Sequence, residues 1–210
     1  MFTEAALSSF AVTLFSMANP IGNVGVFVGV TSDRTPQEAK RIAWACALAV
    51  LITLLIVTWA GSFALKLFGI SIDTLRTAGG IIVLLIGLNM LSNEAKHSHS
   101  PGELSDAKSQ ESVAVVPLAI PIVAGPGTLA AVLVAAQQHP AVLSKLEISF
   151  VILIISGIVG LFFSFAKPVS MKLGRSGMGV VTRVMGMILA AIAMGMLAEG
   201  LKGLFPVLAG

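Results

Sequence analysis

Residues 42–65 read IAWACALAVLITLLIVTWAGSFAL, a run without a single charged side chain. An α-helix rises about 1.5 Å per residue, so about 20 apolar residues cross a hydrocarbon core of about 30 Å. The positions from Ala47 to Ile52 are apolar on all sides, whereas a membrane β-strand alternates in polarity. The run therefore predicts a transmembrane helix.

The rest of the chain repeats this pattern. Of its 210 residues, 56% are hydrophobic and only 11% are charged, against about a quarter charged in soluble domains. This composition excludes an ordinary water-soluble enzyme and predicts an all-α membrane protein. Six transmembrane helices are expected, near residues 7–30, 42–64, 74–92, 113–136, 148–167 and 179–205.

A polar segment divides the chain near its midpoint. Residues 93–112 contain charged, histidine, proline and glycine positions, and we expect a cytoplasmic linker there. It separates a first three-helix unit, 1–92, from a second, 113–210.

Basic residues predict the orientation. The loops after the first, third and fifth expected spans carry most of the 13 Lys and Arg residues. Because basic loops stay in the cytoplasm, both termini are expected on the other side, which is the periplasm for a bacterial inner-membrane protein. The net charge of +3 fits loops that face anionic lipid, and no nucleic-acid partner is expected.

The two halves show an internal repeat. Ala18-Asn19-Pro20 aligns with Ala124-Gly125-Pro126, and Arg76-Thr77-Ala78-Gly79 aligns with Arg183-Val184-Met185-Gly186 at nearly the same offset. Three spans per half is an odd number, so the second half enters the membrane from the opposite side. The sequence therefore predicts two inverted three-helix repeats.

Proline and glycine interrupt the first and fourth expected spans near mid-membrane. Residues 19–23 read NPIGN and residues 121–128 read PIVAGPGT. Proline removes a backbone donor and disfavours helix before it, and glycine eases unwinding. Since an unpaired backbone group in hydrocarbon costs several kcal/mol, two such breaks predict a polar cavity or a bound ligand. The alternative is a pair of proline kinks that only bend the helices.

Six stretches together point to a known family: Met17-Ala18-Asn19-Pro20-Ile21-Gly22, Phe68-Gly69-Ile70-Ser71-Ile72, Arg76-x-x-Gly79-Gly80, Val116-Pro117-Leu118-Ala119-Ile120-Pro121, Ala124-Gly125-Pro126-Gly127-Thr128 and Arg183-x-Met185-Gly186. In these stretches the chain resembles the MarC family of integral membrane proteins. The resemblance implies a bacterial or archaeal inner-membrane protein of six helices. Some members are described as transporters of small neutral amino acids such as glycine and alanine.

We expect a secondary transporter whose substrate binds where the broken helices meet. Half-helix N-termini after each proline would present amides to a carboxylate, and carbonyls before each break would accept protons from an ammonium group. The predicted substrate-binding residues are Asn19, Pro20, Gly22, Asn23, Gly125, Pro126, Gly127 and Thr128. Their small size favours glycine, alanine or serine.

A channel and a non-transporting membrane scaffold are the alternatives. No catalytic set, cofactor or metal site is expected, while a coupling ion, proton or sodium, and a homo-oligomer stay open. Glu199 is expected to be an interfacial carboxylate near Lys202, and its alternative role is that of a titrating group in proton coupling. Arg76 and Arg183 are expected to have structural roles, anchoring helix ends; the alternative is pairing with Asp73 and phosphates.

Overall fold

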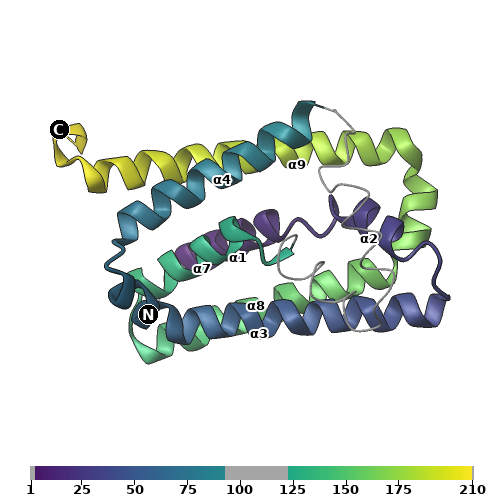
Figure 1. Ribbon diagram of the computed structural model, residues 1–210, viewed down its shortest axis with the longest axis horizontal. Coiled ribbons are helices and arrows are strands. Elements are labelled where there is room, and N and C mark those ends of the chain that lie inside the picture. Colours follow the sequence, from purple (N-terminus) through teal and green to yellow (C-terminus); the bar gives the residue numbers. More distant parts are fainter. Residues whose placement is uncertain (1–2, 93–122, 210) are drawn as a thin grey trace.

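The computed structural model describes residues 3–92 and 123–209, and this part of the chain is helical, without a β-strand. The helices, shown in Figure 1, are α1 (Glu4–Ala18), α2 (Val24–Val30), α3 (Pro36–Phe68), α4 (Ile72–Ser92), α7 (Pro126–Gln138), α8 (Val142–Ser164), α9 (Ala166–Leu204) and the short 3-10 helix η2 (Pro206–Ala209). The expected linker, 93–112, and the first part of the fourth expected span, 113–122, lie outside the described residues.

Four described helices are long and apolar enough to cross a membrane. They are α3, α4, α8 and the Ser176–Leu204 part of α9, and they correspond to the expected spans 42–64, 74–92, 148–167 and 179–205. The expected span 7–30 is divided between α1 and α2, with residues 19–23 between them. The described end of the span 113–136 is α7.

Local sequence signals set the ends of α3. The Thr35 hydroxyl accepts from the Glu38 backbone N–H at 3.3 Å, and the Glu38 carboxylate accepts from the Thr35 N–H at 2.8 Å. This capping box, with Pro36 at the first helical position, starts the helix. Gly69, in a left-handed conformation with φ 64°, ends it.

Helix α9 contains a sharp bend at Gly174. This residue has φ 63° and ψ −177°, which no helix accommodates. The segment before it, Ala166–Leu173, runs across one end of the bundle, and Ser176–Leu204 then returns along its length (Figure 1). Glycine permits this turn because it has no Cβ to clash in the left-handed region.

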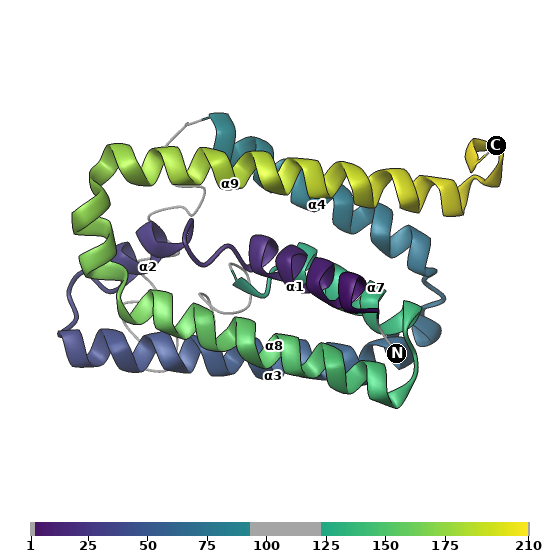
Figure 2. The ribbon, with the colours of Figure 1, turned by 180° about the vertical axis from the view of Figure 1, so that it is seen from behind.

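The long helices pair across the bundle. Helix α3 lies beside α8 and runs antiparallel to it, and α4 lies beside α9 in the same way (Figures 1 and 2). Helices α1 and α7 lie between these two pairs. Helix α7 contacts α3 and α4, while α2 contacts α8 and α9.

Small residues let α4 and α9 approach closely. A Cβ placed on Gly87 would lie 2.8 Å from the Gly186 carbonyl oxygen, and one placed on Gly186 would lie 2.9 Å from the Gly87 carbonyl oxygen. The two backbones are therefore in direct contact at this crossing, as is common between membrane helices.

Large aliphatic side chains cover the outer faces of the bundle. On α3, the side chains of Leu48, Ile52, Ile56 and Phe63 are all about half exposed or more, with Phe63 at 73%. Lipid is the solvent that suits such faces. Both termini lie at the same end of the bundle (Figure 1), as an even number of crossings requires.

Candidate functional site

The first break is organised by Asn19. This residue follows α1 with φ 45° and ψ 53°, the left-handed region, and is 5% exposed. Its Oδ1 accepts a hydrogen bond from the Gly22 N–H at 3.1 Å, and its Nδ2 lies 3.6 Å from the Met90 sulfur on α4. Asparagine tolerates this backbone conformation better than other side chains do, so one residue both ends α1 and links the break to α4.

Its neighbours complete the turn between α1 and α2. The Asn23 side chain donates from Nδ2 to the Ala18 carbonyl oxygen at 3.1 Å. Pro20 is buried, and a Cβ added to Gly22 would collide with the Asn19 amide. Proline removes a helical donor here and glycine makes room for the amide, so the sequence pattern and the local geometry agree.

The described part of the predicted second break, residues 123–125, lies directly before α7. Gly125 is the N-cap residue, with extended φ −66° and ψ 174°, and Pro126 occupies the first helical position. The Thr128 hydroxyl donates to the Val123 carbonyl oxygen at 3.0 Å, and Thr128 is 3% exposed. A Cβ on Gly127 would collide with Val83 of α4, so α7 and α4 touch at this position.

The two breaks share one hydrogen-bond pattern. In each, a polar side chain donates to the carbonyl five residues earlier, Asn23 to Ala18 and Thr128 to Val123. A helix interrupted by proline leaves carbonyls without their usual N–H partner. At each place, a nearby side chain therefore donates to a carbonyl that lacks its usual backbone N–H partner.

The two predicted breaks border the same apolar core. Ala18 and Val24, which flank the first break, and Val123 and Ala124, which precede α7, are each 0% exposed and belong to one apolar cluster. Segments about a hundred residues apart in the chain thus contribute to one core.

Backbone amides at the start of α7 are available for a ligand. The N–H groups of Gly127 and Thr128 form no hydrogen bond with another described residue, and both residues are buried. The first N–H groups of a helix carry a partial positive charge, so this end favours an anionic group such as a carboxylate.

The predicted site residues fall into different environments. Asn19, Pro20, Gly125, Gly127 and Thr128 are buried, Gly22 and Asn23 are partly buried, and Pro126 is exposed. Asn23 and Thr128 both use their side-chain donors within the protein. The prolines at 117 and 121, which contributed to the predicted second break, lie outside the described residues.

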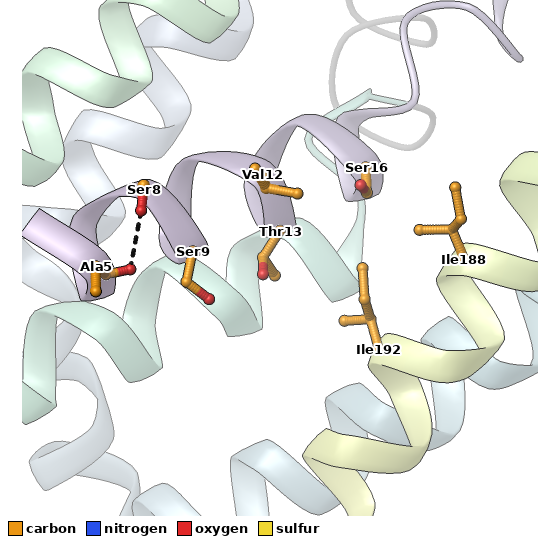
Figure 3. A pocket seen from close by; sticks show the side chains of 8 residues that line it. All are labelled: Ala5, Ser8, Ser9, Val12, Thr13, Ser16, Ile188 and Ile192. Carbon is orange, nitrogen blue, oxygen red and sulfur yellow. Dashed lines mark hydrogen bonds between the residues drawn. The ribbon is translucent and has the colours of Figure 1, made fainter.

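A groove that the sequence reasoning missed lies between α1 and α9 (Figure 3). It has a volume of about 420 Å³, and it is lined by Ala5, Ser8, Ser9, Val12, Thr13, Ser16, Ile188 and Ile192. Ser9, Thr13 and Ser16 are spaced by four and three residues, which puts three hydroxyls on one face of a helix. The sequence shows the spacing of these hydroxyls, but it does not predict that α9 lies opposite them.

An ion pair joins α4 to α9 near the end of the bundle that carries the termini. The Arg76 guanidinium lies 3.2 Å from the Glu199 carboxylate and 3.9 Å from that of Asp73. Arg76 is 9% exposed, while the Glu199 side chain is largely exposed. Glu199 thus pairs with Arg76, a contact that the sequence analysis did not predict, because it requires α4 and α9 to lie side by side.

Within residues 3–92 and 123–209, no group of three or more His, Cys, Asp or Glu side chains gathers at one place.

Comparison with known proteins gives consistent matches along the whole length. Residues 5–205 match the family described as MarC family integral membrane protein. The UPF0056 membrane protein YvbG of Bacillus subtilis is 39% identical, with 94% of each chain covered. The UPF0056 membrane protein YhcE of Escherichia coli is 34% identical, over 94% of this chain and 92% of its own. No solved structure shows significant similarity.

Proposed function

The chain belongs to the MarC family of integral membrane proteins, and we propose that it is a secondary transporter of small neutral amino acids. The observation that carries the proposal is the pair of helix breaks, at residues 19–23 and before α7, with their shared hydrogen-bond pattern inside one core. Interrupted helices that meet at mid-membrane are typical of substrate sites in transporters.

Helix packing supports an inverted repeat. By the sequence alignment α2 corresponds to α7, α3 to α8 and α4 to α9. Helix α2 packs on α8 and α9 as α7 packs on α3 and α4, and the corresponding helices α3 and α8 run antiparallel, as do α4 and α9 (Figures 1 and 2). Two halves related by a twofold axis in the membrane plane would have this arrangement.

The proposed site suits a small zwitterion. The amides of Gly127 and Thr128 would hold the carboxylate, together with the Asn19 side-chain amide. The Ala18 and Val123 carbonyls each retain a second lone pair that can accept from an ammonium group. The small residues around these groups favour glycine, alanine or serine over bulkier amino acids as the substrate.

The orientation follows from charge. The α2–α3 connection and the α8–α9 corner, which carry Arg34, Lys40, Lys167 and Lys172, lie at the end of the bundle opposite the termini (Figure 1). We propose that this basic end is cytoplasmic and that both termini are periplasmic, in the inner membrane of a bacterium.

The first test measures binding to the purified protein in detergent. A ligand that binds the folded state raises its thermal stability, by about 2.7 kcal/mol at a hundredfold excess over Kd. Each of the twenty amino acids is scored, and glycine, alanine and serine are expected to stabilise the protein. Asn19→Ala should reduce the stabilisation at a given ligand concentration, whereas Thr58→Val, which removes a buried hydroxyl on α3, should leave it unchanged.

Flux measurements in proteoliposomes separate the alternatives. Saturable uptake of alanine that falls in Asn19→Ala and Thr128→Val is the expected result for a transporter. Uptake that does not saturate would indicate a channel. If no amino acid either binds to the protein or is transported by it, the proposal is overturned in favour of another solute or a scaffold.

A further inference from the structure

The groove between α1 and α9 has one polar and one apolar wall. Figure 3 shows Thr13 and Ser16 on the side of α1 that is turned toward Ile188 and Ile192 of α9. No charged side chain lines it. A solute that fits such walls combines hydrogen-bonding groups with a short aliphatic part and carries no net charge.

The hydroxyls on the α1 wall are free to bind a solute. Elsewhere in the described helices, five hydroxyls bond to the carbonyl four residues earlier at 2.7 to 2.8 Å, those of Thr31, Thr58, Thr77, Ser149 and Ser164. Such back-bonding satisfies a hydroxyl in an apolar setting. The hydroxyls of Ser144 and Ser156 are buried without a partner within residues 3–92 and 123–209. Ser9, Thr13 and Ser16 donate no hydrogen bond to any described residue.

Ser16 is the decisive member of this set. It is only 4% exposed, yet it lines the groove. Its hydroxyl is not one of the fully buried, unpartnered hydroxyls, which in the described part of the chain are those of Ser144 and Ser156. It opens onto the groove instead, where water or a polar solute can bond to it. Ser8 differs, because its hydroxyl bonds to the Ala5 carbonyl at 3.0 Å.

The groove leads to the first break. Ser9, Thr13 and Ser16 follow one face of α1 toward its end at Ala18, and ten residues of helix from Ser9 to Asn19 cover about 15 Å. Its other end, at Ala5, is the end of the bundle that carries the termini (Figure 1). The three hydroxyls therefore lie one after another along α1 between that end of the bundle and Asn19.

We propose that the α1–α9 groove is the hydrated path by which a small, uncharged or zwitterionic solute reaches the Asn19 break from the side of the membrane that carries the termini. The assignment of the solute to amino acids rests on the proposed function. The path itself rests on the groove and on its unpartnered hydroxyls.

Cysteine accessibility tests the path. Cys46 is the only cysteine in the sequence and is buried, so Cys46→Ala gives a background for Ser9→Cys, Thr13→Cys and Ser16→Cys. These variants are treated with a charged methanethiosulfonate that cannot cross the membrane. The cysteine thiolate, which forms in water, attacks the reagent and displaces its sulfinate group. Cysteines in the path should therefore react at least about tenfold faster than lipid-facing ones.

Two matched positions serve as controls. Ile52→Cys, at the centre of α3 and 49% exposed, places a thiol in lipid. Leu14→Cys, on α1 and 0% exposed, places one in the core. Labelling of positions 13 and 16 from the terminal side alone is expected, and rates no faster than that of Ile52→Cys would overturn the path.

Protection by solute separates this proposal from the amino-acid assignment. Alanine should slow the labelling of Ser16→Cys if both are right. Labelling that no amino acid slows would keep the path and overturn the assignment. Stabilisation of the protein by alanine, together with unreactive cysteines at 13 and 16, would keep the assignment and overturn the path.

Discussion

The replacement of Asn19 by alanine tests the first break most directly. Asn19 is the only non-glycine residue with positive φ among residues 3–92 and 123–209, and its Oδ1 accepts from the Gly22 N–H at 3.1 Å. The left-handed conformation costs an alanine about 1–2 kcal/mol, and loss of the hydrogen bond costs about 0.5–1.5 kcal/mol. Asn19→Ala should therefore destabilise the protein by about 2–3 kcal/mol.

Asn19→Gly separates these two contributions. Glycine adopts φ 45° without strain but lacks the amide, so the expected loss is about 1–2 kcal/mol, from the hydrogen bond and from the greater freedom of the unfolded chain. The free energy of unfolding is measured in mixed micelles with increasing dodecyl sulfate, followed by circular dichroism. Equal stability of the alanine and glycine variants would refute the left-handed conformation, and wild-type stability of both would refute the hydrogen bond as well.

The same variants report on binding. If the Asn19 amide contacts the substrate, both lose a hydrogen bond that contributes about 0.5–1.5 kcal/mol, which weakens alanine affinity by about two- to tenfold. Binding is measured at a temperature where each variant is fully folded. Unchanged affinity in Asn19→Gly would show that Asn19 only shapes the backbone.

Three further substitutions, two of them with a matched control, test the α4–α9 packing, the start of α7 and the Arg76–Glu199 ion pair. Gly87→Ala should lower the free energy of unfolding by about 1–3 kcal/mol, because its Cβ would press on the α9 backbone. Gly157→Ala, which meets nothing within 4 Å, should instead be neutral or gain up to about 1 kcal/mol; equal losses would contradict this. Thr128→Val should cost about 1–3 kcal/mol by leaving a buried carbonyl unpaired. Thr58→Val should cost less, because its acceptor carbonyl keeps a helical N–H partner. Glu199→Gln should change stability by less than about 1 kcal/mol, since this carboxylate is largely exposed; a larger loss in thermal unfolding would show a stronger ion pair.

The sequence predicted the long helices well but not where they end. Apolar runs located α3, α4, α8 and the last part of α9, because the thickness of the bilayer sets the length of a span. Helix α3 nevertheless extends beyond the expected 42–64 at both ends, from Pro36 to Phe68. Its capping box and its terminal glycine, rather than its hydrophobicity, determine those limits. The bend at Gly174 had no signal beyond the glycine itself.

Contacts between residues that are far apart in the chain could not be predicted from the sequence. The pattern NPIGN placed an interruption at residues 19–23, and the structure has one there. Whether the polar side chains nearby face a ligand or the chain itself depends on the path of the backbone through the turn. The Arg76–Glu199 pair likewise required α4 to lie beside α9, which local periodicity does not encode.

The internal hydrogen bonds of the breaks bear on how a substrate would bind. Side chains already satisfy the Ala18 and Val123 carbonyls, so an ammonium group would only share acceptors that are in use. The Gly127 and Thr128 amides have no such partner among the described residues, and pairing a buried donor recovers about 1–3 kcal/mol. At the proposed site, the carboxylate of a neutral amino acid would therefore contribute more to binding than its ammonium group, and a small amide or amine that lacks the carboxylate would bind poorly.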